Sequence, residues 1–374
     1  MYESISLFSG AMGLDLGLET AGINVNLCQD FDKSCYNTIT KNNRNALLGD
    51  IRNITSEQIL EASGLHRGKA FLINGGPPCQ PFSTAGKRMG INDPRGSLFM
   101  DYVRMVNEIK PRFFCFENVK GLVSIAVDEG GKPGSVLEII LSEFQRIGYR
   151  VCFGVLDAVH YGVPQFRERL IIIGSRDNED IFLPMPSNFQ RHQEKEMKWN
   201  ILGNAIKDLE DDESECTRFS EERLRYLRLV PEGGNWKDLP EELVKDAMGG
   251  AYNSGGGKVG FYRRLSYSQP SPTLVTSPVQ KATMMCHPTK DRPLSVSEYA
   301  RIQQFPDDWN LAGTISSKYK QIGNAVPIGL AMAIGKAIIS TAENNSIINT
   351  KRTRGTSVHT KVNEAMEELR YGLK

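Results

Sequence analysis

The feature that most constrains the fold is an alternation, through the first 186 residues, of short apolar runs with longer amphipathic stretches. Short apolar runs are typical of strands in a buried parallel sheet, and amphipathic stretches between them are typical of crossover helices. The alternation predicts an α/β fold with a doubly wound, mostly parallel sheet. We expect strands at Ser4–Phe8, Ile23–Gln29, Ala70–Asn74, Arg112–Phe116, Arg150–Leu156 and Arg169–Gly174, and helices that include Asp32–Asn42, Ser97–Lys110 and Ser135–Ile147.

Length and composition indicate a soluble globular chain. Its 374 residues, 40% hydrophobic and 24% charged, suffice for one large domain and a smaller one. No run of about 18 apolar residues is present, and Met1–Gly10 lacks the pattern of a signal peptide, so we expect no membrane segment and a cytoplasmic location. The seven cysteines form no CxxC pair, which argues against a disulfide scaffold and against a zinc site, so we expect no metal.

A second, smaller domain is predicted after Pro184, where the amino-acid composition of the sequence changes. Met185–Tyr262 is richer in charge and glycine and contains the run Gly249–Gly257. Residues 187–262 hold eleven Lys and Arg against fifteen Asp and Glu, a net charge of −4, while the whole chain has a net charge of +1. Global charge therefore gives no sign of a polyanionic partner, and any surface for nucleic acid must be local.

Two helices are predicted near the end of the chain. Ser295 and Glu298 form an S-x-x-E capping box, so a helix should begin there and end before Pro306. Pro327 suits the first turn of a helix, and the apolar residues that follow it predict a last helix.

A glycine-rich turn follows the first predicted strand, in the sequence Phe8-Ser-Gly-Ala-Met-Gly-Leu-Asp-Leu-Gly17, and Asp30 closes the second strand. Glycines let the backbone approach a ligand, and a carboxylate about 20 residues on can bind a ribose hydroxyl. The spacing G-x-x-G-x-x-x-G departs from the dinucleotide fingerprint, which disfavours a nicotinamide dehydrogenase. The turn indicates either a site for a nucleoside-containing cofactor or a structural strand-to-helix connection.

Cys79 lies in the stretch Gly75-Gly-Pro-Pro-Cys-Gln-Pro-Phe-Ser83, directly after a predicted strand. Three prolines stiffen the loop at the carboxyl end of a parallel strand, where such sheets bind their ligands. A cysteine is intrinsically nucleophilic and can attack an electrophilic carbon. Cys79 is therefore a candidate nucleophile, with an inert buried cysteine as the alternative.

Charged candidates follow two further strands. Glu117 ends the strand that includes Phe116, which should bring it to the same sheet edge as Cys79, and a carboxyl in an apolar pocket can act as a proton donor. Arg167 and Arg169 lie two residues apart, so on an extended chain they point the same way and can orient a carboxylate or grip a phosphate. Without context, a capping or surface role for Glu117 and an ordinary charged strand entry for the arginines remain open.

Taken together, these blocks resemble the cytosine C5 DNA methyltransferase family of the prokaryotic restriction-modification type. The resemblance covers residues 4–186 and about 263–342. The motifs that carry it, in the same order as in the family, are FSGAMGLDLG, Asp30, Gly49-Asp50-Ile51, GGPPCQPFS, Arg95-Gly-Ser-Leu-Phe99, ENV at Glu117, YGVPQFRER at Tyr161–Arg169, RPLSVSEYARIQQFPDDW at Arg292–Trp309 and IGNAVP at Ile322–Pro327.

The resemblance implies an S-adenosylmethionine-dependent, Rossmann-like catalytic and cofactor-binding domain at 1–186 plus 316–345. It also implies a target-recognition domain at 187–285, a hinge at 286–315 and a C-terminal tail at 346–374. Asp30 is shorter than the glutamate often found at its position, and Phe31 replaces a common tryptophan, so we expect somewhat looser cofactor binding. The cofactor-binding residues that the resemblance implies are Phe8, Gly10, Gly13, Leu14, Asp30, Phe31, Asp50, Ile51, Pro78, Leu98 and Asn324.

The resemblance also implies the chemistry. Cys79 would add to C6 of a cytosine, Glu117 would protonate N3, and C5 would take up the methyl group before the C5 proton and Cys79 leave. Arg167 and Arg169 would steady Glu117 and the base. Because C6 lies inside the base stack, the cytosine must be flipped out of the duplex.

Double-stranded DNA is the partner that the resemblance implies, bound by a monomer in the cytoplasm at the nucleoid, with a cognate restriction endonuclease as a functional companion. Thr273-Leu274-Val275 looks like the short Thr-Leu element of the recognition domain. A tRNA cytosine-5 methyltransferase is an alternative, although no Cys-Phe-Thr triplet occurs here, and a catalytically silent DNA-binding protein of the same fold is another. The residues expected to contact DNA are Gln80, Ser83, Lys258, Arg263, Arg264 and Thr273.

Overall fold

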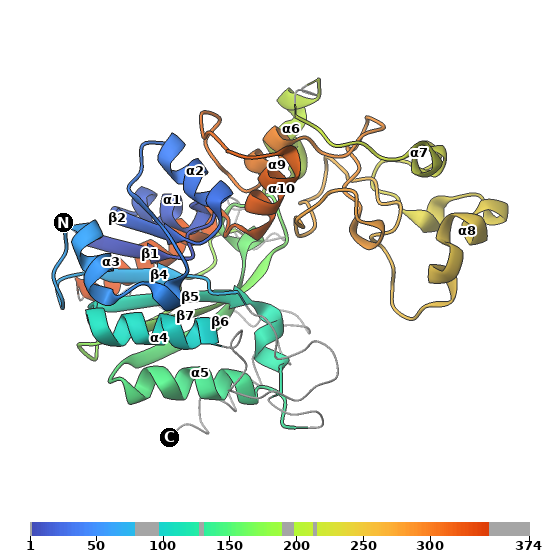
Figure 1. Cartoon of the computed structure of the whole chain (residues 1–374). Helices are drawn as coiled ribbons and strands as arrows, with labels where there is room; N and C mark the ends of the chain where they lie inside the picture. Colours follow the sequence, from blue (N-terminus) through green and yellow to red (C-terminus); the bar gives the residue numbers. More distant parts are fainter. Residues whose placement is uncertain (1, 79–96, 127–130, 189–197, 212–214, 344–374) are drawn as a thin grey trace.

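The computed structural model describes residues 2–78, 97–126, 131–188, 198–211 and 215–343. In this part of the chain seven strands form one sheet in the order β3-β2-β1-β4-β5-β7-β6 (Figure 1). Strands β1 to β5 pair in parallel, and β7 is inserted antiparallel between β5 and β6. The strands are β1 (Tyr2–Leu7), β2 (Ile23–Asp30), β3 (Ala46–Leu48), β4 (Leu72–Gly75), β5 (Phe113–Val119), β6 (Arg150–Asp157) and β7 (Glu168–Ser175).

Helices cover both faces of this sheet, because consecutive strand residues point to opposite sides. Phe114 and Phe116 of β5 pack into a core with α3, α4 and α5, whereas Phe113 and Cys115 pack into a second core with α1 and α11. The predicted doubly wound, mostly parallel α/β fold is therefore confirmed. The helices of these two layers are α1 (Gly13–Thr20), α2 (Lys33–Lys41), α3 (Ser56–Ser63), α4 (Ser97–Ile109), α5 (Ser135–Arg146) and α11 (Ile328–Ala342).

Helix α11, the last helix of the described chain, packs against α1, the first. Gly17 of α1 faces Ala331 of α11 so closely that a β-carbon on Gly17 would overlap the Ala331 side chain, and Gly335 meets Ala21 in the same way at 2.7 Å. Small residues thus let the two helix backbones approach. By length and composition the stretch Ile315–Ala342 would suffice to cross a membrane, but 67% of its most apolar window is buried inside the fold.

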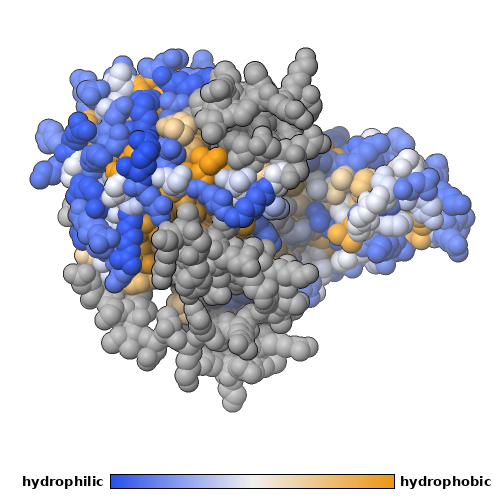
Figure 2. All heavy atoms as spheres, turned by 90° about the horizontal axis from the view of Figure 1, so that it is seen from below, coloured by the Kyte–Doolittle hydropathy of each residue, from blue (hydrophilic) through white to orange (hydrophobic). Residues whose placement is uncertain are grey.

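A lobe projects from the body at the level of α7 (Glu221–Leu227) and α8 (Glu241–Met248), as Figure 1 shows. It has its own small core, which includes Leu227, Val230 and Tyr262. The face of the lobe that Figure 2 shows is mostly hydrophilic, with scattered apolar residues. The lobe lies within the predicted recognition region, although the predicted domain boundaries stay a prediction.

Another core joins that region to the body. Leu202 and Ile206 of α6 (Leu202–Ile206) pack with α9 (Val296–Ile302) and α10 (Ile315–Asn324). Helix α9 begins with the predicted capping box, in which the Ser295 hydroxyl accepts from the Glu298 amide and the Glu298 carboxylate accepts from the Ser295 amide.

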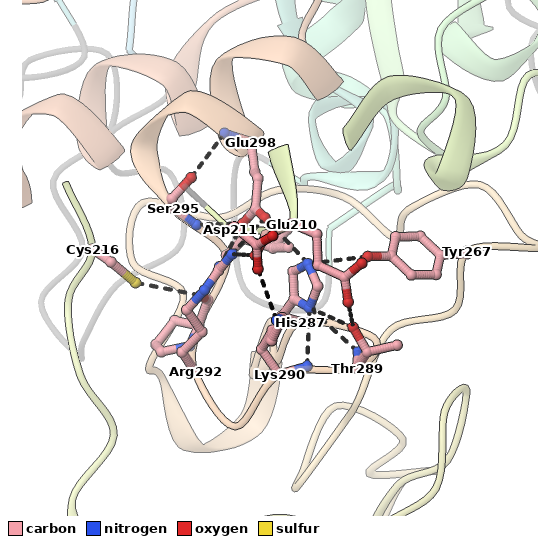
Figure 3. A network of polar contacts seen from close by, with 12 residues as sticks. Glu210, Asp211, Cys216, Tyr267, His287, Thr289, Lys290, Arg292, Ser295 and Glu298 are labelled. Atoms are coloured by element: carbon pink, nitrogen blue, oxygen red, sulfur yellow. Dashed lines mark hydrogen bonds and ion pairs between the residues drawn. The ribbon is translucent and has the colours of Figure 1, made fainter. Parts of the chain in front are cut away.

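Glu298 is also the centre of a buried polar network (Figure 3). Arg292 donates to both Glu298 oxygens, at 2.8 and 2.9 Å, and His287 Nε2 lies 3.2 Å from Oε1. Burial raises the pKa of Glu298, but the hydrogen bonds from Arg292 and His287 outweigh burial, so the pKa lies below its ordinary value. Arg292 also donates to the backbone oxygen of Glu210, so the network fixes the 287–298 segment to the chain next to α6.

Candidate active site

Two charged side chains face each other across neighbouring strands at the carboxyl end of β5. Arg169 Nε donates to Glu117 Oε1 at 2.8 Å, and the side chains are only 11% and 12% exposed. Val119 pairs with Arg169 in the antiparallel ladder, so the register of β5 and β7 sets this distance. Burial raises the pKa of Glu117 above its ordinary value, while Arg169 and Arg167 lower it in part.

Gly76 makes room for this carboxyl group. A β-carbon at position 76 would lie 2.5 Å from Glu117 Oε2, closer than real contacts allow. Asn118 holds the same loop from the other side, because its Nδ2 donates to the Pro77 backbone oxygen at 3.0 Å. The start of the loop that carries Cys79 is thus fixed against Glu117. Cys79, Gln80 and Ser83 themselves lie outside the described residues.

Arg167 is buried, with 1% of its surface exposed, and it binds backbone oxygens instead of a carboxylate. Its Nη1 donates to Leu274 O at 3.0 Å and its Nη2 to Gly323 O at 2.7 Å. Burial lowers the pKa of the guanidinium, followed in size by repulsion from Arg169. The resemblance implies that Arg167 and Arg169 steady Glu117 and the base. In the structure Arg169 binds the Glu117 carboxylate directly, whereas Arg167 binds two distant segments of the chain and makes no hydrogen bond to Glu117 among the described residues.

The glycine-rich turn after β1 is organised by Asp30, at the end of the adjacent strand β2. Asp30 Oδ2 accepts from the Gly10 amide at 2.8 Å, and Oδ1 accepts from the Asp32 amide at 2.8 Å. Phe8 and Gly10 both have positive φ, 55° and 57°, which the tight turn requires. Burial raises the pKa of Asp30, and the backbone hydrogen bonds counter that shift. The predicted cofactor turn and its carboxylate are therefore adjacent.

Gly13 and Leu14 have structural roles. A β-carbon on Gly13 would overlap the backbone of Val326 and lie 2.9 Å from the Ala325 side chain. Leu14 is 8% exposed, and it packs in the core between α1 and α11.

Sequence reasoning did not single out a buried acid–amide pair below this turn. Asn74 Nδ2 donates to Asp15 Oδ1 at 2.7 Å, and both side chains have no exposed surface. Asp15 Oδ2 and Asn74 Oδ1 have no hydrogen-bond partner within the described structure. Burial raises the pKa of Asp15 to about 7. Asp15 belongs to the FSGAMGLDLG motif, but its burial depends on β4, which lies far away in sequence.

Three of the predicted cofactor residues, Phe31, Asp50 and Ile51, lie around the ends of β2 and β3. Phe31 is 66% exposed, an unusual position for a phenylalanine, and it follows β2 directly. Ile51 is 2% exposed. Asp50 is held by Arg52, whose Nε donates at 2.9 and 3.0 Å to its two oxygens, and these bonds lower the pKa of Asp50. Phe31 thus presents a free aromatic face, while Asp50 is engaged with a neighbour.

Three predicted cofactor residues come from other elements. Pro78 is exposed at the end of the described loop after β4, Leu98 is half-buried in the first turn of α4, and Asn324 is exposed as the last residue of α10. Asn324 follows Gly323, whose backbone oxygen accepts from Arg167.

The predicted DNA contacts at Arg263 and Arg264 do not fit their environments. Arg264 is 6% exposed, and its guanidinium donates to the backbone oxygens of Val230, Leu227, His287 and Lys290 and to the Asp291 carboxylate. Arg263 donates to Met284 O at 3.0 Å, and burial lowers its pKa to about 10. Both side chains are committed to the fold, so we replace their predicted role with a structural one.

Lys258 and Thr273 keep an accessible position. Lys258 follows the exposed glycines of the 249–257 run, and its Nζ donates to Tyr252 O at 2.6 Å. Thr273 is exposed, and its hydroxyl donates to Phe166 O at 2.7 Å.

Fold and site together define an α/β enzyme in which the buried carboxyl group of Glu117, a candidate acid, lies beside the loop that carries a candidate nucleophile. A family model of C-5 cytosine-specific DNA methylases matches residues 2–340. The chain belongs to this family, and its activity is that of a DNA cytosine-5-methyltransferase.

Three relatives of high sequence similarity are named Type II methyltransferases. The chain is 43% identical to the Type II methyltransferase M.PspPI of Psychrobacter sp. (strain TA137), over 90% of this chain and 79% of that protein. It is 40% identical to the Type II methyltransferase M.Sau96I of Staphylococcus aureus, over 90% and 76%. A solved structure of a chain described as a DNA modification methyltransferase, encoded within an E. coli prophage, has the same fold, with a TM-score of 0.65, 24% identity and coverage of 92% and 100%.

Proposed function

We propose that this protein transfers a methyl group from S-adenosylmethionine to C5 of a cytosine that is flipped out of a specific double-stranded DNA sequence. The observation that carries the proposal is the buried Glu117 carboxyl group, bound by Arg169 and packed against Gly76 three residues before Cys79. An acid with a raised pKa, next to a loop that carries a thiol, suits addition of the thiol to C6 of cytosine.

Glu117 is the proposed proton donor. Because burial raises its pKa, a larger fraction of the carboxyl is protonated near neutral pH than for an exposed glutamate. Its proton would pass to N3 as the Cys79 sulfur forms a bond to C6, which leaves C5 enamine-like. S-adenosylmethionine supplies the electrophilic methyl group when bound. A water molecule would then take the C5 proton, the C6–sulfur bond would break to release the Cys79 thiolate, and N3 would return its proton to Glu117, which restores the aromatic ring.

The residues at the ends of β1 and β2 fit a nucleoside-containing methyl donor. Gly10 and its neighbours form a turn that a carboxylate already organises, and the exposed ring of Phe31 offers a face for an adenine. Asp30 and Asp50 provide acceptors at the same edge, and Asn324 approaches from α10. We propose that these residues hold the cofactor and that the Asp50–Arg52 ion pair rearranges when Asp50 accepts from the adenine amino group.

The proposed DNA contacts on the lobe centre on Lys258. Its Nζ lies 5.9 Å from the centre of the Trp236 ring, and Lys237 and Lys245 lie 6.0 Å from the rings of Trp236 and Tyr252. Three ammonium groups thus surround two aromatic rings in a region whose overall charge is negative. We add Lys237 and Lys245 to Lys258 and Thr273 as proposed DNA contacts, with phosphates as the main ligands of the lysines.

Protection of DNA against a cognate restriction endonuclease is the proposed biological role. It is supported by the names of the relatives, which are Type II methyltransferases. We further propose that the protein acts as a monomer in the cytoplasm, with residues 1–186 and 316–345 as the catalytic domain and residues 187–285 as the target-recognition domain.

The first experiment is a transfer assay with radiolabelled S-adenosylmethionine, in which unmethylated genomic DNA and bulk tRNA are offered separately. We expect label in DNA as 5-methylcytosine, and we expect Cys79→Ala to abolish it. Label in tRNA alone would overturn the DNA assignment, and label in neither would overturn the methyl transfer. Cys152→Ala is the matched control, because Cys152 lies in the edge strand β6, three strands from β4. Bisulfite sequencing of the labelled DNA then maps the target site.

A further inference from the structure

Three distant segments of the chain meet beside the Glu117–Arg169 pair. The segment before β7 pairs with the 271–275 segment of the recognition region: the Ser271 amide donates to Pro164 O at 2.8 Å, and the Phe166 amide donates to Ser271 O at 2.8 Å. Gly323, at the end of α10, packs on the same place, because a β-carbon there would lie 2.5 Å from Val275 O. Here the recognition region, the strand that carries Arg169 and the helix that carries Asn324 are in direct contact.

Two buried glutamines join these segments. Gln165 Oε1 accepts from the Leu274 amide at 2.9 Å, and its Nε2 donates to Gln303 Oε1 at 3.0 Å. Gln303 Nε2 in turn donates to the backbone oxygens of Ile322 at 2.7 Å and Ala325 at 3.1 Å. Gln165 and Gln303 have no exposed surface. Each side-chain amide therefore binds one segment through its NH2 group and a different segment through its oxygen.

Arg167 completes the junction, since it donates to Leu274 O and Gly323 O. Leu274 is thus held at its amide by Gln165 and at its carbonyl by Arg167. A shift of the 271–275 segment would leave buried polar groups unpaired unless the 165–169 segment moved with it. Arg169, two residues beyond Arg167, would then carry the shift to the Glu117 carboxylate.

We propose that Gln165 and Gln303 are positioning residues that keep the recognition region in register with the catalytic acid, so that a correct DNA sequence places Glu117 and Arg169 for reaction. This inference rests on the proposed function of the site. It predicts that loss of either glutamine lowers the discrimination between target and non-target DNA. This loss should exceed any change in discrimination that a control variant with the same loss of stability shows.

The test measures kcat/KM on a duplex with the mapped target site and on a duplex with one altered base pair. We expect Gln165→Met and Gln303→Met to lower the ratio of the two values about tenfold each, as the loss of a buried hydrogen bond implies. The double variant should be no worse than either single variant, because the two side chains are links of one chain of hydrogen bonds from Leu274 to Ile322, and loss of either link breaks it. Gln321→Met is the matched control: Gln321 is also a buried glutamine that makes several side-chain bonds, to Thr38, Ala312 and Ser317, but none to the junction.

The proposal is overturned if the ratio stays at the wild-type value while the Tm falls as much as in Gln321→Met, or if the two substitutions add. If the Met variants do not fold, the same comparison uses Gln165→Asn, which keeps the amide but shortens its reach. An inactive wild-type enzyme would instead refute the proposed function, so the two failures are distinguishable.

Discussion

Glu117 and Arg169 hold each other at 2.8 Å across two strands that run in opposite directions, although 52 positions separate them in sequence. The antiparallel insertion of β7 beside β5 makes this possible, because it brings the first residues of one strand next to the last residues of the other. A carboxyl group held in this way is oriented before any substrate arrives, which is what a proton donor requires.

Glu117→Gln should abolish most methyl transfer and leave the fold intact. The amide is isosteric and still accepts from Arg169, but it cannot donate a proton to N3, so we expect kcat to fall by a factor on the order of 10² to 10⁴. In the wild type, the protonated fraction of Glu117 decreases as the pH rises through its raised pKa, so kcat should fall on the alkaline side. A pH profile of kcat checks both points, and a variant as active as the wild type would refute the assignment.

Gly76→Ala should impair the same step through geometry. The added methyl group would lie 2.5 Å from Glu117 Oε2, so the carboxyl must move away from its place beside Arg169. We expect kcat to fall at least tenfold, with a small loss of Tm. Gly121→Ala is the control, because nothing lies within 4 Å of a β-carbon there. Equal activity of the two variants would contradict the predicted role of Gly76.

Asp15→Asn should change how stability depends on pH. The folded pKa is raised from 3.8 to about 7, so within that window the unfolded chain has lost the proton that the folded chain still holds. Rising pH therefore destabilises the wild type by about 1.4 kcal/mol per pH unit at this site, and the effect is complete above the folded pKa. The asparagine cannot ionise, and its Nδ2, which takes the place of the unpartnered Asp15 Oδ2, can donate to the unpartnered Asn74 Oδ1.

Urea denaturation between pH 4.5 and 8 measures this effect. We expect the stability of Asp15→Asn relative to wild type to increase across the window. Asp308→Asn, the same change at an exposed position, is the comparison variant. A constant difference between Asp15→Asn and wild type would show that the Asp15 pKa is not raised.

Arg264→Met should unfold the lobe more readily without a specific effect on DNA binding. The substitution leaves the backbone oxygens of Leu227 and Val230 without their donor in a buried place, at about 1 to 3 kcal/mol each, so we expect a loss of roughly 2 to 5 kcal/mol in the free energy of unfolding. DNA affinity measured well below the Tm should stay within about twofold of wild type. A variant with normal Tm and much weaker DNA binding would restore the phosphate-contact role.

Lys258→Ala should weaken DNA binding and leave the stability of the protein almost unchanged, the reverse of Arg264→Met. Removal of one phosphate contact should weaken binding to all DNA sequences alike and reduce the slope of log K against log salt by about 1, with little change in Tm. Lys69→Ala is the control, because Lys69 is exposed and lies just before β4, at the amino ends of the strands, whereas Glu117 lies near their carboxyl ends. Identical salt slopes for both variants would exclude Lys258 as a DNA contact.

The sequence by itself determined the strands and helices of the body, because burial on one or two faces leaves a local periodicity. The predicted strands near Ile23, Arg112 and Arg150 agree with β2, β5 and β6 within two residues at the amino end. The three-residue edge strand β3 was missed, since Ala46–Leu48 is too short to show a period. The motif around Cys79 and the capping box at Ser295 were also readable, because their chemistry lies within a few consecutive residues.

Only the tertiary structure decided which charged groups serve the site and which serve the fold. Arg169 and Arg264 were both candidate site residues from the sequence, yet Arg169 binds Glu117, whereas Arg264 is buried and binds backbone carbonyl oxygens. Gln165 and Gln303, 138 positions apart, carry no local signal of their contact. The physical reason is that hydrogen bonding and burial depend on all neighbours in space, most of which come from elsewhere in the chain, whereas a sequence pattern reports only the neighbours along it.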